Sequence, residues 1–82
     1  MQLQKGMVVR AIAGKEMDHF YVITDLDARF AFIADGKHRP LDRPKHKNVR
    51  HLRATSTVWD IGDMTDRALR RSLQEFSAKG GY

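Results

Sequence analysis

Basic side chains gather between residues 37 and 53, where they could bind a polyanion. Three histidines (His38, His46 and His51) and one carboxylate (Asp42) lie among seven fixed positive charges. The stretch therefore carries +6, whereas the whole chain carries +5, so the remaining residues sum to −1. A positive field this local predicts contacts with phosphate groups, as in nucleic-acid binding. The seven charges belong to Lys37, Arg39, Arg43, Lys45, Lys47, Arg50 and Arg53.

A charge-rich loop that only keeps the protein in solution is the alternative interpretation of this stretch. Two prolines, Pro40 and Pro44, favour binding instead, because they hold the chain in an extended path or an edge strand. Apolar residues within the stretch also favour binding, because they could anchor it to the rest of the protein. In an extended path, alternate side chains share a side. Residues of one parity would then form a basic edge, namely Lys37, Arg39, Arg43, Lys45 and Lys47.

Other kinds of chemistry find little support in the sequence. The chain has no cysteine, which excludes disulfides and thiolate metal sites. The three histidines of the basic stretch lie among cations that would repel a metal ion, so we expect no metal site. The aspartates at positions 60, 63 and 66 fit a helix start better than a calcium loop. Without a nucleophile elbow, a phosphate loop or a dinucleotide fingerprint, we predict a non-enzyme that uses no cofactor.

The size and composition of the chain indicate one small domain. It has 82 residues, of which 41% are hydrophobic and 30% charged, with a pI near 10.0. This balance is ordinary for a globular protein, and the basic pI fits an anionic partner. No stretch approaches the roughly 20 apolar residues of a membrane span, and the first residues lack the apolar run of a signal peptide. We therefore expect no membrane association and a cytoplasmic location.

Short β-strands are expected over most of the first half of the chain. β-Branched and aromatic residues predict strands at 7–13, 19–26 and 29–34. Gly14 marks the first turn, and Asp35-Gly36 is typical of a two-residue hairpin with a type I′ turn. The three-residue spacing of Val49 and Leu52 predicts a single helical turn before a short last strand.

The second half of the chain is predicted to hold a linker and one helix. Residues 54–62 form the linker, which packs on the strands, and residues 63–78 the helix. Thr65 is the expected N-cap, and the spacing of Leu69, Leu73 and Phe76 predicts an apolar stripe that packs on the strands. Residues 1–53 are predicted to form a five-stranded SH3-like barrel. Together with the linker and the C-terminal α-helix, this barrel makes a mainly β single domain. We expect the aromatic residues of the strands to lie in the core rather than to stack on bases, namely Phe20, Tyr21, Phe30 and Phe32.

Two parts of the sequence resemble a known family. Gly6-Met7-Val8-Val9 followed by Gly14-Lys15 looks like a KOW motif, and Ala34 to Leu52 resembles the second half of KOW domains in certain large-subunit ribosomal proteins. The likeness covers roughly residues 3–53 and includes short bacterial KOW-domain RNA-binding proteins. It implies an SH3-like barrel that binds ribosomal or other structured RNA without catalysis. The turn positions of the pattern are Gly6, Gly14, Asp35 and Gly36.

One position departs from this pattern. Asp18 stands where the KOW motif usually has a second glycine, and its carboxylate would repel phosphate. Asp nevertheless tolerates the positive φ of such a position better than most residues. The resemblance adds two weaker contacts in this first loop to those of the basic stretch. The residues predicted to contact RNA are then Lys15, His19, Lys37, His38, Arg39, Arg43, Lys45, His46, Lys47, Arg50, His51 and Arg53.

Two other partners fit the same charge. Small SH3-like barrels also bind proteins, so the basic edge could dock an acidic partner of the transcription or translation machinery, a ribosomal protein among them. Binding of DNA without sequence preference is the third alternative, since a phosphate backbone attracts the same cations.

Overall fold

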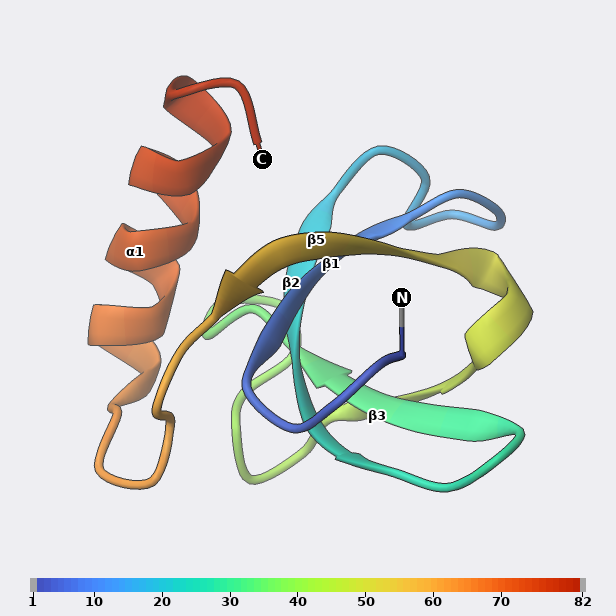
Figure 1. The fold of residues 1–82 in the computed structure, drawn as a ribbon. Helices are drawn as coiled ribbons and strands as arrows, with labels where there is room; N and C mark the ends of the chain where they lie inside the picture. Colours follow the sequence, from blue (N-terminus) through green and yellow to red (C-terminus); the bar gives the residue numbers. More distant parts are fainter. Residues whose placement is uncertain (1, 82) are drawn as a thin grey trace.

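The computed structural model describes residues 2–81, which form a five-stranded antiparallel sheet followed by one α-helix (Figure 1). The mainly β prediction with a C-terminal helix is confirmed. No helix in the described part of the chain is long and apolar enough to cross a membrane. The elements are β1 (Met7–Ala11), β2 (Phe20–Leu26), β3 (Phe30–Ala34), β4 (Lys45–Asn48), the 3₁₀ turn η1 (Val49–His51), β5 (Leu52–Val58) and α1 (Asp66–Ala78).

The strands lie in the order β4-β3-β2-β1-β5. The first four strands pair with their neighbours in sequence, and β5 then pairs with β1. The chain must therefore pass from one edge of the sheet to the other between β4 and β5. It does so through η1, the single helical turn that the sequence predicts. The basic stretch makes this crossing, so its residues are carried to both edges of the sheet.

The sheet buries both of its faces. One face encloses a core that includes Met7, Val9 and Ile23. The opposite face contributes Val8 and Val22, which α1 covers with its apolar stripe. Strand β1 is apolar at successive positions because its alternate side chains enter two different cores.

The helix begins and docks as its sequence predicts. The Thr65 hydroxyl accepts a hydrogen bond from the backbone N–H of Ala68 at 3.1 Å and caps the first turn. Leu69 and Leu73 are buried against the sheet. Phe76 is half-buried and meets aromatic rings of β2 and of the segment before the helix edge-on. The predicted apolar stripe therefore packs on the chain's own sheet.

The predicted linker at residues 54–62 is wrong over its first half. Residues 54–58 belong to β5, where the Thr55 hydroxyl donates a hydrogen bond to the Val8 carbonyl at 2.6 Å. The Thr- and Ser-rich sequence of β5 is polar because most of its side chains are exposed or half-buried. β-Branched threonine suits a strand even without an apolar alternation.

The two-residue hairpin predicted at Asp35-Gly36 is also wrong. Residues 35–44 form a longer connection between β3 and β4. The Asp35 carboxylate accepts hydrogen bonds from the backbone N–H groups of Lys37 and Arg39, at 2.9 and 2.8 Å, and so closes a wider turn. Gly36 does adopt the expected positive φ, of 78°. The connection also reaches α1, since the Asp66 carboxylate accepts a hydrogen bond from the Leu41 N–H at 2.7 Å.

Candidate nucleic-acid interface

The basic stretch does not form the continuous extended edge that the sequence predicts. Its first residues lie in the turn beside α1, its middle forms the edge strand β4, and its end enters β5 at the opposite edge. The cations are therefore divided among separate places on a molecule that measures 28 × 26 × 24 Å. Each place has its own electrostatic surroundings.

A first group surrounds an open depression of about 380 Å³ between the sheet and α1. Lys37 and His38 line it from the turn after β3, and His19 lines it from the loop before β2. The structure thus brings together predicted contacts that are distant in sequence. Arg70 of α1 joins them, a residue that the sequence pattern did not single out because it lies on the polar side of an ordinary amphipathic helix. Asp18 and Asp35 line the same depression and offset part of its charge.

A second group, Lys45 and Lys47 of β4, is bound within the protein. The Lys45 ammonium lies 3.1 Å from one carboxylate oxygen of Glu16, and that of Lys47 lies 3.6 Å from the other. Lys47 also donates a hydrogen bond to the Ala13 carbonyl at 3.0 Å and is only 8% exposed. The prediction that Lys47 contacts phosphate is therefore wrong. Its ammonium holds the loop after β1 against β4 and cannot reach a phosphate from there.

The register of β4 explains this burial. Lys45 pairs with Ile33 and Lys47 with Ala31, both of which point into the core. The predicted shared parity of the two lysines is correct, but the shared side faces inward. Glu16 meets them from a loop about thirty residues away in sequence, so spacing within the basic stretch could not reveal it.

Glu16 responds electrostatically to these two lysines. The pKa of the Glu16 carboxyl lies below its ordinary value of 4.5, mainly because the Lys45 ammonium donates a hydrogen bond to it. Partial burial acts in the opposite direction and raises the pKa. A lowered carboxyl pKa stabilises the folded state above the unfolded-state pKa. This contribution is lost as the pH falls through the folded-state pKa, so the cross-link weakens only in acid.

We expect replacement of Lys47 by Met to destabilise the fold. Met keeps the apolar stem but leaves the Ala13 carbonyl without its hydrogen-bond donor and one Glu16 oxygen without its ion-pair partner. The expected loss is about 2–3 kcal/mol in the free energy of unfolding. Lys45→Met is the matched control and should cost no more than about 1 kcal/mol, because the Lys45 side chain is one-third exposed and water screens its charge. Urea unfolding of both variants measures the difference, and equal losses would contradict the structural role of Lys47.

A third group lies at the crossing between the two sheet edges. Arg50 is exposed in η1 and, with Arg29 and Phe30, lines a depression of about 340 Å³. Arg53 is exposed at the start of β5 and pairs in register with Arg10 of β1. Neither Arg29 nor Arg10 lies in the basic stretch, and only the strand register brings them near it. The remaining predicted contacts divide into the exposed Lys15, Arg43, His46 and His51 and the half-buried Arg39.

The backbone of the loop after β1 places a special demand on Asp18. Asp18 has a φ of 69°, and within residues 2–81 it is the only residue other than glycine with a positive φ. Its N–H donates to the Ala11 carbonyl at 2.8 Å, which fixes this conformation. The position therefore requires the left-handed geometry that glycine adopts freely.

We expect Asp18→Gly to stabilise the protein by about 0.5–1 kcal/mol, because a left-handed side chain is strained there. Asp18→Asn removes the charge but keeps a side chain that tolerates positive φ, so its stability should stay close to that of the native protein. Asp18→Ala should be less stable than both. Thermal unfolding of the three variants tests the order, and an alanine variant as stable as the glycine variant would contradict it.

The strand aromatics divide between core and surface. Tyr21 is buried as predicted, and burial, with the charges of Asp35 and Glu16, raises its pKa to about 12. Phe32 is instead 37% exposed, so its prediction as a core residue is wrong. It lies on the outward side of β3 beyond the part that α1 covers. There it neighbours Phe30, which is half-buried, and His46 of β4.

Comparison with known proteins places no family name on this chain. No protein-family model matches it, and no curated protein is significantly similar to it. What the surface can bind must therefore be argued from its own charge and geometry.

Most of the fixed charge of the basic stretch forms no ion pair in the described part of the chain. Within residues 2–81, no three histidine, aspartate or glutamate side chains come together as metal ligands would. Of the seven fixed charges of the basic stretch, the two lysines of β4 are in ion pairs, whereas the other five form none in the described structure. Those five are Lys37, Arg39, Arg43, Arg50 and Arg53.

Proposed function

We propose that this protein is a non-catalytic RNA-binding protein that contacts the phosphates of ribosomal or other structured RNA. The observation that carries the proposal is the set of five cations that form no ion pair within residues 2–81, on a chain whose other residues nearly balance in charge. Unpaired surface cations are the groups that neutralise phosphates and release counterions. Arginine adds a planar fork that matches two phosphate oxygens.

The proposal includes an SH3-like, KOW-type barrel as the scaffold. The strand order β4-β3-β2-β1-β5 and the 3₁₀ turn before the last strand support this assignment. So does Asp18, whose positive φ fits the glycine position of the KOW pattern. Structured RNA is recognised largely by its shape and backbone, which suits cations fixed at several places on a small rigid sheet.

The salt dependence of binding gives a direct physical measure. If three to five cations contact phosphates together, log K should fall against log salt with a slope of about −2 to −4. A structured ribosomal RNA fragment labelled with a fluorophore supplies the binding signal. A slope near zero would contradict a phosphate-contact mechanism.

Crosslinking in cells, followed by sequencing of the recovered RNA, tests the proposal and identifies the RNA. We expect reads concentrated on ribosomal RNA in a cytoplasmic fraction. The rival function is a protein-interaction module that docks an acidic partner of the transcription or translation machinery. A pull-down repeated after nuclease treatment separates the two, because a protein partner survives digestion of the RNA. Survival of every partner, with no crosslinked RNA, would overturn the RNA-binding proposal.

A further inference from the structure

Three aromatic rings lie side by side on the outward side of β3 and β4. We call Phe30, Phe32 and His46 the aromatic platform. The rings of Phe30 and His46 are stacked, with centroids 4.2 Å apart and planes inclined by 26°. The Phe32 and His46 rings have centroids 5.2 Å apart. The strand register places them, since His46 is the partner of Phe32 across the two strands.

The platform is exposed because α1 covers a neighbouring part of β3 and does not extend over these rings. Ala34, two residues after Phe32 on the same side of β3, is buried under α1. Phe32 is 37% exposed and His46 is exposed. Among the large hydrophobic side chains that are exposed within residues 2–81, Phe32 is the only aromatic one. The Phe32 ring is therefore partly exposed to solvent.

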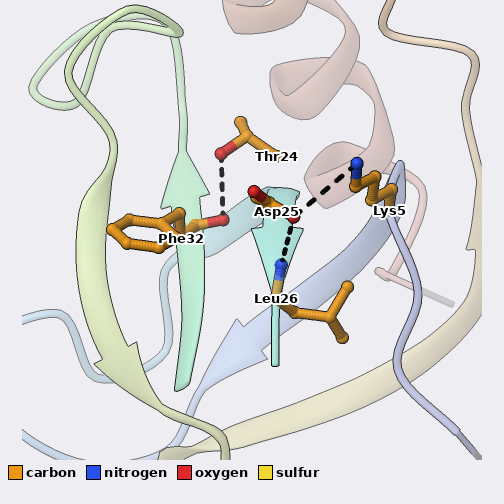
Figure 2. A network of polar contacts seen from close by, with 5 residues as sticks. All are labelled: Lys5, Thr24, Asp25, Leu26 and Phe32. Carbon is orange, nitrogen blue, oxygen red and sulfur yellow. Dashed lines mark hydrogen bonds and ion pairs between the residues drawn. The ribbon is translucent and has the colours of Figure 1, made fainter. Parts of the chain in front are cut away.

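The backbone beneath Phe32 is fixed. Figure 2 shows its carbonyl accepting a hydrogen bond from the Thr24 hydroxyl, at 3.2 Å, while its ring points away from β2. Asp25, the register partner of Phe32 on the other side, forms an ion pair with Lys5 at 3.6 Å. The nearest carboxylate of β2 is therefore partly neutralised, which lowers its repulsion of an anion bound at the platform.

Positive charge borders the opposite end of the platform. Phe30 lines a depression of about 340 Å³ together with Arg29, Asn48 and Arg50. The backbone N–H groups of Phe30 and Arg29 lower the pKa of Asp27, so this exposed carboxylate stays ionised nearby. It disfavours phosphate close to itself, whereas Arg29 and Arg50 both line the depression as exposed cations.

We propose that the aromatic platform stacks unpaired bases of single-stranded RNA, with Phe32 and His46 against the bases and Arg50 against an adjoining phosphate. Base faces are apolar and pack on aromatic rings regardless of sequence, whereas a cation beside the rings selects a polyanionic strand. This inference rests on the proposed function and deepens it: the protein would hold a looped or unpaired region of its RNA here and use its other cations on the backbone.

Binding of two RNAs by Phe32 variants tests this inference. The probes are a fluorophore-labelled single strand of ten uridines and an RNA duplex without unpaired nucleotides, measured by anisotropy at one salt concentration. Loss of base stacking typically costs about 1–3 kcal/mol per base, so Phe32→Ala and Phe32→Leu should weaken single-strand binding roughly 5- to 150-fold. Duplex binding should stay unchanged. Phe32→Tyr keeps the ring and should retain single-strand binding.

Val58→Ala is the matched control, because Val58 is an apolar side chain, 45% exposed, at the other edge of the sheet. It should bind both RNAs as the native protein does. Thermal unfolding confirms that each variant folds. Normal single-strand binding by Phe32→Ala, with salt-dependent binding of both RNAs intact, would overturn the platform but leave the proposed function standing. A native protein that binds neither RNA would overturn both, and tighter binding of a thymidine DNA strand would overturn the assignment to RNA.

Discussion

Replacement of Gly36 by Ala is expected to remove at least about 3 kcal/mol from the free energy of unfolding. Gly36 has a φ of 78°, and a Cβ there would lie 2.2 Å from the carbonyl oxygen of Asp66 in the first turn of α1. Both atoms are fixed by the backbone, so the helix start must move away. The melting temperature should fall by at least about 12 °C for a domain of this size.

The same substitution should separate the helix from the sheet before the sheet itself unfolds. Trp59 is the only tryptophan of the chain, and its ring lies 6.0 Å from that of Phe76 in α1. Tryptophan fluorescence therefore reports helix docking, while far-ultraviolet circular dichroism reports the whole fold. In the Gly36 variant, we expect the fluorescence transition to precede the circular-dichroism transition.

Gly14→Ala is the matched control for this steric effect. Gly14 has nearly the same φ, 83°, but a Cβ there would meet only side-chain atoms of Lys47 and Glu16. A left-handed alanine costs about 1–2 kcal/mol, and the Lys47 ammonium, 2.9 Å from the added Cβ, must also shift. The loss should therefore lie at the upper end of this range, still below that of the Gly36 variant, in which the clash is with backbone. Equal losses for the two glycine variants would show that close approach to α1 does not limit the fold.

Local signals in the sequence predicted the elements of this fold well. The first three strands lie within two residues of their predicted bounds, and the N-cap at Thr65 is confirmed. These features depend on residues that are close in sequence, such as a β-branched run or a capping hydroxyl. The last strand was predicted too short, because residues 54–58 of β5 are held by pairing with β1, about 45 residues earlier, and not by their own polar sequence.

The site was harder to predict because side chains of opposite parity in β4 have opposite environments. Lys45 and Lys47 point inward to Glu16, while His46 points outward to Phe30 and Phe32. A strand's parity is visible in sequence, but which side faces the core is decided by distant partners. The sequence thus identified the parity that Lys45 and Lys47 share, but it could not show that this side faces Glu16 and the core.

The structure therefore changes which cations a mutational test should remove. In a variant that replaces Arg43, Lys45 and Lys47 together, lost binding could not be told from lost stability, because Lys47 is buried. Three exposed arginines without ion pairs in the described structure avoid this problem, namely Arg43, Arg50 and Arg53. Their replacement by glutamine keeps a polar side chain of similar length and should leave the melting temperature within a few degrees of the native value.

We expect this triple glutamine variant to bind structured RNA about 100-fold more weakly at 0.1 M salt. Each phosphate contact contributes about 0.7 to the salt slope for a single strand and about 0.9 for a duplex, so three lost contacts lower its magnitude by at least about 2. If the two proteins bind equally at 1 M salt, a slope difference of 2 makes their binding constants differ by about a factor of 10² at 0.1 M salt. The affinities of the two proteins should therefore converge as salt is raised, which distinguishes lost counterion release from misfolding.

The matched control removes the same charge from α1. Arg67 and Arg71 are exposed in α1, and Lys79 is exposed at its C-cap, all outside the basic stretch. Their replacement by glutamine also lowers the net charge by three. If the whole protein's charge attracted RNA, both triple variants would lose affinity equally. If the proposed interface is correct, the control variant should keep most of its affinity for RNA, and its slope of log K against log salt should not change. Only cations that contact phosphate release counterions on binding. Equal losses would mean that the basic stretch is no binding surface.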